Sequence, residues 1–278
     1  LDHLGNIRTA VCCLSSLNLE HYEEWEKDKN FIPDIMRFLD NILSDFIKKA
    51  PEYMKNAIYS ATRERSVGLG VMGFHSFLQS KMLPIEGVMA KSWNKKIFKH
   101  IKEEVDRASK LIAEEKGACP DAMEAGIMER FSNKIAIAPT ASISVIAGNT
   151  SPGIEPYAAN VFTQKTLSGS FVVKNKYLAD VLAKYGKDNA EVWSSITING
   201  GSVQHLPYLS EDEKLIFKTA FEINQMWLVE HAADRTPFIC QAQSFNLFFP
   251  GNVSKKELHI AHFESWKKGI KSLYYCRS

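Results

Sequence analysis

Two adjacent cysteines and two adjacent tyrosines are the side chains of this sequence best suited to redox chemistry. Cys12 and Cys13 lie in an apolar segment near the N-terminus, and Tyr274 and Tyr275 lie near the C-terminus. Adjacent side chains of a strand point to opposite faces, so only one of the two cysteines can face a given cavity in a redox or radical role. Neighbouring phenols can pass an oxidising equivalent, because a phenol loses an electron and a proton together. Taken alone, burial as a small hydrophobe is the favoured explanation of the cysteines and strand packing is the default explanation of the tyrosines, so spacing does not establish redox chemistry.

Three hydroxyl side chains cluster at an expected helix start, in the run 139–144 (PTASIS). Such a turn exposes backbone N–H groups that can bind a phosphate. The alternative is ordinary capping of a helix N-terminus by Thr or Ser, and the run does not choose between the two. The irregular segment 148–156 that follows would form the rim of a site.

Other motifs carry weaker signals. Residues 68–73 (GLGVMG) match the dinucleotide-binding pattern G-x-G-x-x-G, which must follow a strand and open a helix. The preceding residues 61–66 (ATRERS) are not typical of a buried strand, so we favour a glycine-rich strand packed closely on a neighbouring backbone. His259 and His262 share a helix face, but neither H-E-x-x-H nor C-x-x-C occurs, and no metal site is expected.

Composition limits the class of protein. The 278 residues are 45% hydrophobic and 24% charged, which is ordinary for a globular chain and excludes disorder. With 34 Lys and Arg against 32 Asp and Glu, the formal charge of +2 predicts no nucleic-acid surface. No apolar run approaches the roughly 20 residues that span a bilayer. Five scattered cysteines do not form a disulfide scaffold, so we expect a cytoplasmic location.

The elements that must position the cysteines and the hydroxyl run are predicted from periodicity. Residues 8–19 are expected to form a strand that carries Cys12. A helix has Pro33 in its first turn and ends before Pro51, and a second helix covers 93–116 and ends at Gly117. A short strand over 134–138 leads into the hydroxyl run.

The C-terminal elements are predicted from capping signals. Ser210 with Glu213, and Ser254 with Glu257, are capping-box patterns. The first predicts a helix reaching residue 233 and the second a helix closed by Gly269. Strands are expected over 238–241, 245–249 and 272–276, the last one carrying the two tyrosines. Helices alternate with strands and no linker divides them, so we predict one α/β domain over 1–278.

Taken together, these segments resemble the large, catalytic subunit of class I ribonucleotide reductase. Four segments carry the resemblance: 10–19 (AVCCLSSLNL), 66–73 (SVGLGVMG), 138–142 (APTAS) continuing to 153–156 (GIEP), and 273–275 (LYY). Each is modest alone, but their joint order is specific. The resemblance implies the C-terminal half of a ten-stranded α/β barrel of the ribonucleotide reductase type, with Cys12 on its first strand and the tyrosines on its last.

The resemblance also implies a reaction. In that family a thiyl radical abstracts the 3′ hydrogen of a ribonucleoside diphosphate, and two further cysteines reduce the 2′ position. Cys12 aligns with one of that pair, and Cys13 is expected only to pack. Tyr274 aligns with the tyrosine nearest the radical cysteine and Tyr275 with the one that faces the small subunit. The substrate-binding residues it implies are Thr140, Ala141, Ser142, Ile143 and Ser144. Some relatives have a hydroxyl at the position of Ile143, which here offers only its backbone N–H.

Partners follow from the same resemblance. It implies no cofactor bound by this chain, and a radical cofactor of the dimetal or tyrosyl type in a partner small subunit. The radical cysteine, the first cysteine of the redox pair and the allosteric nucleotide sites are expected on an N-terminal part of the large subunit. Thioredoxin or glutaredoxin is the expected reductant, with no nucleic acid and no membrane as partner. We therefore expect a split or truncated large subunit that is inactive as an isolated chain.

Three alternatives remain open at this point. A non-catalytic assembly fragment of the same fold would not need Cys12, Tyr274 and Tyr275. A coenzyme-B12-dependent relative generates its radical within one chain, so it would not need the tyrosine pair. A dehydrogenase built on residues 68–73 ranks last.

Half a barrel would also leave open sheet edges, so we expect poor solubility of the isolated chain.

Overall fold

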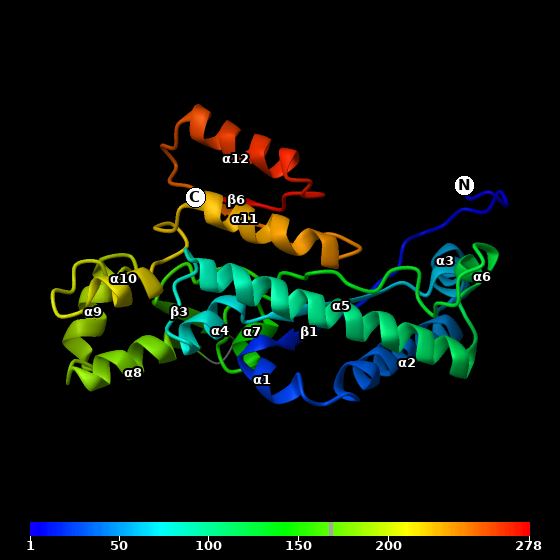
Figure 1. The fold of residues 1–278 in the computed structure, drawn as a ribbon, viewed down its shortest axis with the longest axis horizontal. Helices are drawn as coiled ribbons and strands as arrows, with labels where there is room; N and C mark the ends of the chain where they lie inside the picture. Colours follow the sequence, from blue (N-terminus) through cyan, green and yellow to red (C-terminus); the bar gives the residue numbers. More distant parts are fainter. Residues whose placement is uncertain (167–168) are drawn as a thin grey trace.

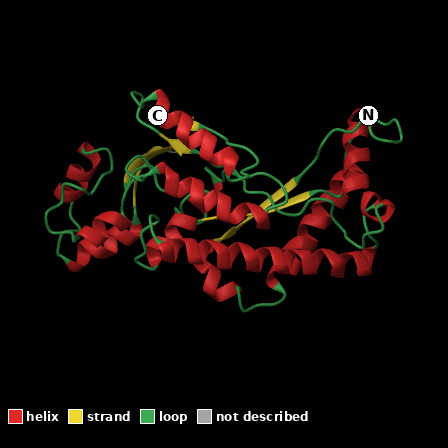
Figure 2. Ribbon diagram, turned by 45° about the horizontal axis from the view of Figure 1, so that its top comes forward, coloured by secondary structure: helices red, strands yellow, loops and turns green. Residues whose placement is uncertain are grey.

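Five neighbouring parallel segments form the centre of the computed structural model, which describes residues 1–166 and 169–278. Strand β1 (Cys13–Asn18) pairs in parallel with β2 (Val67–Met72), and single parallel bridges join β2 to residue 135 and residue 137 to residue 243. Strand β5 (Leu247–Phe248) then pairs in parallel with β6 (Cys276–Arg277). The strands cross the middle of the molecule with helices around them (Figure 2). This is the succession of parallel strands expected for half of an α/β barrel.

Two long helices cover this half-barrel. Helix α5 (Val88–Lys116) spans most of the molecule, and α2 (Phe31–Lys49) packs along it (Figure 1). The predicted apolar stripe of α5, from Ile97 to Ile112, is buried, and Gly117 ends the helix with a φ of +87°. Pro33 lies in the first turn of α2, as predicted. Helices α11 (Gln225–Arg235) and α12 (Lys255–Lys267) lie on the opposite side of α5 from α2.

The remaining elements are short. They are the helices α1 (Tyr22–Trp25), α3 (Lys55–Glu64), α4 (Phe74–Ser80), α6 (Pro120–Glu124), α7 (Ile143–Ile146), α8 (Lys176–Lys184), α9 (Ala190–Ile198) and α10 (Glu211–Ile216), the antiparallel strands β3 (Val161–Thr166) and β4 (Gly169–Lys174), and three 3-10 turns at Leu19–His21, Glu52–Met54 and Thr236–Phe238. Helices α8 to α10 have a hydrophobic cluster of their own that is separate from the main one, and they lie at one end of the molecule (Figure 1).

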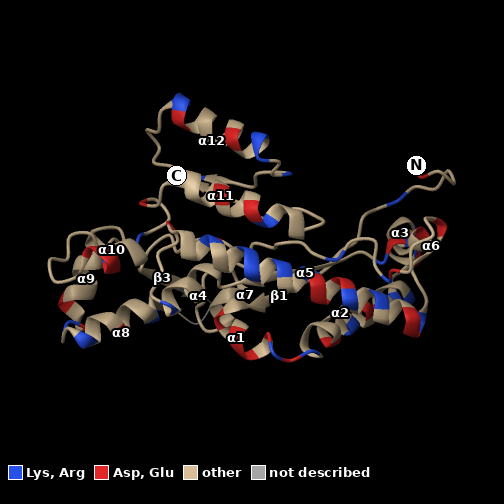
Figure 3. Cartoon of the chain, viewed as in Figure 1, with Lys and Arg blue, Asp and Glu red and all other residues tan. Residues whose placement is uncertain are grey.

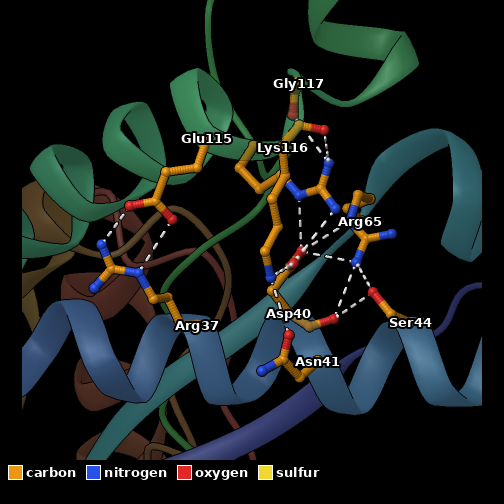
Figure 4. Close-up of polar contacts among 9 residues, drawn as sticks. Arg37, Asp40, Asn41, Ser44, Arg65, Glu115, Lys116 and Gly117 are labelled. Carbon is orange, nitrogen blue, oxygen red and sulfur yellow. Dashed lines mark hydrogen bonds and ion pairs between the residues drawn. The ribbon is translucent and has the colours of Figure 1, made fainter.

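A buried carboxylate joins α2 to α5 and to the start of β2. The side chain of Asp40 is fully buried and accepts from Arg65 Nη2 at 2.7 Å and from Arg130 Nε at 2.8 Å. Lys116 Nζ lies 3.1 Å from its second oxygen. Arg65 itself takes a left-handed φ of +45°, which ends α3 and turns the chain into β2. Figure 4 shows Arg65 and Lys116 pointing toward this carboxylate.

Two predicted elements are wrong in extent. The predicted helix from Ser210 to residue 233 is two helices, α10 and α11, separated at 217–224. The break follows from side-chain competition for backbone N–H groups: Glu222 accepts from the N–H of Thr219, and Asn224 caps α11 by accepting from the N–H of Met226. The strand predicted over 8–19 begins only at residue 13.

The C-terminal strands are also shorter than predicted. Residues 236–238 form a 3-10 turn where a strand over 238–241 was expected, because Pro237 favours the turn. Residues 134–138 join their neighbours through isolated bridges rather than a continuous ladder. Only 247–248 and 276–277 are regular strand, yet Tyr274 N–H still donates to Phe245 O at 2.9 Å. Both predicted capping boxes are confirmed, and Gly269 follows α12 with a φ of +76°.

Charged side chains concentrate on the outer helices. Lys, Arg, Asp and Glu are dense along α5 and α2 (Figure 3), while the strands carry few. In the part of the chain that the structure describes, no helix is both long enough and apolar enough to cross a membrane.

Candidate active site

An open groove of about 390 Å³ brings three of the predicted site segments together. It contains Cys12, Pro139 at the start of the hydroxyl run, and Tyr274. Its full lining is Cys12, Leu14, Ala136, Ile137, Ala138, Pro139, Gln241, Ala242, Gln243, Ser244, Ser272 and Tyr274. These residues come from the neighbouring parallel segments, so the half-barrel itself creates the groove. Residues 262 positions apart in the sequence (274 − 12 = 262) therefore share one cavity.

The Cys12 thiol lies just before β1 and is oriented by an amide. Its Sγ is 3.8 Å from Gln241 Oε1, and Gln241 Nε2 donates to Val67 O at 2.9 Å, which fixes the amide. Burial raises the pKa of the Cys12 thiol, so the group is a neutral hydrogen donor near pH 7. The neighbouring Cys13 packs partly buried against the main hydrophobic cluster, which agrees with the packing role expected for it.

The glycine run is a buried strand that makes room for this groove. A Cβ on Gly68 would lie 3.1 Å from Cys12 Sγ and 2.5 Å from a Leu14 methyl carbon. A Cβ on Gly70 would lie 2.4 Å from the backbone oxygen of Ala136. Gly68 and Gly70 thus lie on β2 itself and permit close strand contact, and only Gly73, with a φ of +81°, stands between β2 and α4. The interpretation as a closely packed strand is confirmed, and the dinucleotide loop is wrong.

The two tyrosines are in contact with each other. Their ring centroids are 4.2 Å apart at an interplanar angle of 57°, and both rings are about half exposed. The adjacent Tyr275 phenol raises the pKa of Tyr274. Tyr275 N–H donates to Asn246 Oδ1 at 2.8 Å, so a side chain continues the strand pairing at this point. Tyr274 faces the groove with Cys12, whereas Tyr275 lines neither this groove nor the hollow described below.

The hydroxyl run forms a tight turn before α7. Thr140 has a left-handed φ of +53°, and its Oγ1 accepts from Gly153 N–H at 2.7 Å. Ser144 is buried and its N–H donates to Thr140 O at 3.0 Å. Ala141, Ser142 and Ile143 are exposed at the outside of the turn. Ser142 stands at the N-cap of α7 without a side-chain capping bond, so helix capping does not explain its hydroxyl.

A second hollow, of about 270 Å³, lies on the other side of this turn. It is bounded by Ala141 and Ser144 from the turn, Glu155 from the following loop, and Arg277 from β6. Glu155 is 8% exposed, and its Oε1 accepts from Asn246 Nδ2 at 2.7 Å. Burial raises the pKa of Glu155 to about 7. Glu155 was not among the residues predicted for the site, although a glutamate set between Ile154 and Pro156 is a signal that could have identified it.

Within the described residues, no group of three or more His, Cys, Asp or Glu side chains is arranged to hold a metal ion. The histidines with the largest shifts are buried inside the protein: desolvation lowers the pKa of His75 to about 3 and that of His231 to about 4. The side chains that line the groove offer a thiol, a phenol, hydroxyls and amides.

Comparisons with known proteins agree with this arrangement. The family model described as "Ribonucleotide reductase, barrel domain" matches residues 4–125 and 121–276. The chain is 51% identical over 275 residues to the ribonucleoside-diphosphate reductase large subunit of Invertebrate iridescent virus 6, covering 98% of this chain and 28% of that protein. It is 48% identical over 274 residues to the large subunit of Invertebrate iridescent virus 3, covering 98% of this chain and 43% of the relative.

A solved structure shows the same similarity in three dimensions. The Actinobacillus ureae class Id ribonucleotide reductase alpha subunit matches with a TM-score of 0.89 and 35% identity, over 98% of this chain and 50% of that chain. The α/β barrel class predicted from the sequence is thereby confirmed. The chain spans at most half the length of these relatives.

Proposed function

The chain belongs to the family of ribonucleotide reductase barrel domains, and from this premise we propose that it supplies part of the catalytic barrel of a class I ribonucleoside-diphosphate reductase. The observation that carries the proposal is the single groove that holds Cys12, the start of the hydroxyl turn and Tyr274. We take residues 1–278 as one domain of that barrel. Its substrate would be a ribonucleoside diphosphate and its product the 2′-deoxy compound.

Each site residue has a distinct task in this proposal. Cys12 is one of two thiols that reduce the 2′ carbon: the C2′–OH bond breaks, a C2′–H bond forms, water leaves, and the two thiols become a disulfide. Its raised pKa suits it to donate hydrogen rather than to act as a thiolate. Tyr274 and Tyr275 carry the oxidising equivalent toward the groove. Residues 140–144 bind the diphosphate through backbone N–H groups and hydroxyls.

The proposal requires partners. The radical cysteine and the second thiol of the pair would come from an N-terminal part of the large subunit, together with the allosteric nucleotide sites. A small subunit would hold the radical cofactor, and thioredoxin or glutaredoxin would reduce the disulfide. We place the assembly in the cytoplasm. The alternative is an assembly fragment of the same fold without turnover, and the contact between Tyr274 and Tyr275 at 4.2 Å favours the catalytic role.

The test is conversion of CDP to dCDP by the native assembly recovered with this chain as bait. Wild type is compared with Cys12→Ser and Tyr274→Phe, and Cys13→Ser serves as the matched thiol control. We expect turnover in wild type and in the control, and none in the other two variants. Absence of turnover in wild type, with the N-terminal part and the small subunit confirmed present, would favour the assembly fragment.

A further inference from the structure

The side chain of Glu155 is linked to Tyr275 by two sets of contacts. On the first route Glu155 Oε1 accepts from Asn246 Nδ2 at 2.7 Å, and Asn246 Oδ1 accepts from the backbone N–H of Tyr275 at 2.8 Å. The Asn246 amide is 2% exposed, so this relay is shielded from water. A buried amide that is bonded at both ends has a fixed orientation. The position of the Tyr275 backbone is therefore coupled to the Glu155 side chain.

The second route passes through an arginine. Arg277 Nε lies 3.9 Å from Glu155 Oε2, and the Arg277 guanidinium carbon lies 5.7 Å from the centre of the Tyr275 ring. A guanidinium at this distance interacts with the face of an aromatic ring. Arg277 is partly exposed and lines the same hollow as Glu155, so the carboxylate is the opposite charge beside it there.

We propose that Glu155 is a positioning residue for Tyr275: the ionised carboxylate holds the Tyr275 backbone through Asn246 and the Tyr275 ring through Arg277. The inference rests on the proposed function, in which Tyr275 passes an oxidising equivalent to Tyr274. Transfer between two phenols depends steeply on their distance and orientation, so a side chain that fixes Tyr275 controls the rate. Glu155 does not line the groove that holds Cys12 and Tyr274, so it would act on the reaction through Tyr275.

The charge of this carboxyl is set to change near neutral pH. Burial raises the pKa of Glu155 to about 7, with Arg277 and Asn246 acting in the opposite direction. The titratable or charged groups that face it are Arg277 from β6, Tyr274 from the preceding segment, His231 and Arg235 from α11, and Tyr157 from its own loop. His231 is neutral at pH 7 because burial lowers its pKa to about 4. Burial lowers the pKa of Arg235 to about 9, which still leaves it charged.

These neighbours make Glu155 the group that titrates in this hollow between pH 6 and pH 8. When Glu155 is protonated, the attraction for Arg277 disappears and the Tyr275 ring loses its restraint, while the contact of Asn246 with the Tyr275 backbone remains. Turnover should therefore fall as the pH drops through about 7. Glutamine in place of Glu155 can still accept from Asn246 but cannot attract Arg277, so Glu155→Gln should mimic the protonated state at every pH.

The experiment measures kcat and KM for a ribonucleoside diphosphate in the assembled reductase from pH 6 to pH 8. For Glu155→Gln we expect kcat about tenfold below wild type at pH 8 and about twofold below at pH 6. KM should be unchanged. Glu211→Gln, the same change on the exposed first turn of α10, is the control and should follow wild type. Arg277→Gln should lower kcat at pH 8 to a similar extent, and the double variant should be no worse than either.

A second readout does not depend on turnover. Infrared difference spectra of wild type minus Glu155→Gln should contain the C=O band of a protonated carboxyl that disappears with a midpoint near pH 7. If wild type turns over but the kcat ratio is the same at pH 6 and pH 8, the inference is wrong while the proposed function stands. A raised KM with normal kcat would instead place Glu155 at the diphosphate turn and overturn the positioning role. If wild type itself does not turn over, the proposed function fails, and the infrared midpoint still reports on the carboxyl.

Discussion

At the scale of single residues, Glu155 is a group whose charge costs stability. Its pKa is about 7 in the folded protein and about 4.5 in an unfolded chain, because burial disfavours the ionised form. A raised folded pKa means that the contribution of Glu155 to stability is fully present below pH 4.5 and is lost as the pH rises through 7. A buried carboxylate whose only role was to support the fold would not be expected to lower the stability of the protein at neutral pH.

Glu155→Gln should therefore make the surrounding structure more stable at high pH. We expect the variant to raise the opening free energy of residues 243–248 by about 1 to 3 kcal/mol at pH 8, and to leave it unchanged below pH 4.5. Native-state hydrogen exchange of the assembled protein measures this locally. Lower protection at pH 8 would show that the carboxylate stabilises the segment, contrary to the sign given by its raised pKa. A stabilised but slower enzyme would separate the stability of the segment from its function.

The sequence pointed to the side chains proposed to react more readily than to the residues that support them. Cys12, Tyr274 and the turn at 139–144 were found from residue type and from resemblance. Gln241, Asn246 and Glu155 were not selected, because amides and carboxylates are common in loops and nothing in one sequence marks which of them is buried. Their significance arises from hydrogen bonds between segments roughly 30 to 230 positions apart, which no local pattern encodes.

At the scale of elements, the Asp40 cluster holds the helical layer on the sheet. Arg65, Arg130 and Lys116 come from three different segments, and each loses its counter-charge if this carboxylate is neutralised. These cations lower the pKa of Asp40 in spite of its burial. A lowered folded pKa gives stability that is present above the unfolded value of 3.8 and is lost as the pH falls through the lower folded value.

Asp40→Asn should loosen α2 from α5. Because three cations would remain around a neutral amide, we expect a loss of about 3 kcal/mol in the opening free energy of α2 at pH 7. Hydrogen exchange of α2 amides in the assembled protein measures it. Asp45→Asn is the matched control on the same helix: its partner Lys49 is exposed, so the change should stay within about 0.5 kcal/mol. Equal effects of the two substitutions would contradict a special role of the buried cluster.

The glycines of β2 have different tolerances for a side chain. Gly70→Ala would place its Cβ 2.4 Å from the backbone oxygen of Ala136, which moves only if the neighbouring segment moves. Gly68→Ala meets mainly the flexible end of Leu14. We expect Gly70→Ala to lower the opening free energy of β2 by about 3 kcal/mol and Gly68→Ala by about 1 kcal/mol. Exchange of the β2 amides is the measurement, and the reverse order would show that β2 is not held as the structure describes.

Elements with strong local signals were predicted well, and those defined by their neighbours were not. The stripe of α5 and both capping boxes are local patterns, and the structure confirms them. The break at 217–224 depends on Glu222 and Asn224 accepting from backbone N–H groups. Residues 134–138 carry a strand pattern, but in the structure only Ile135 and Ile137 form bridges to neighbouring segments, so the pairing is not continuous.

At the scale of the whole molecule, the five parallel segments have two outer edges. Strand β1 pairs on one side with β2, and β6 pairs on one side with β5, while no further strand of the described chain pairs with either one. Unpaired backbone groups along a strand invite pairing with another chain. The match covers only 50% of the alpha subunit, so strands from elsewhere in a complete barrel are the natural partners for these edges.

The 278-residue chain on its own should therefore self-associate. We expect size-exclusion chromatography with light scattering to give oligomers whose size grows with concentration. Leu14→Lys should increase the monomer fraction, because Leu14 is 55% exposed on β1 and a charge there opposes pairing of edges. Leu215→Lys, on exposed α10 away from both edges, is the control and should not change the distribution. A monomeric wild-type chain at all concentrations would mean that the edges are protected without a partner, and the need for a complementary half-barrel would then have to rest on chemistry alone.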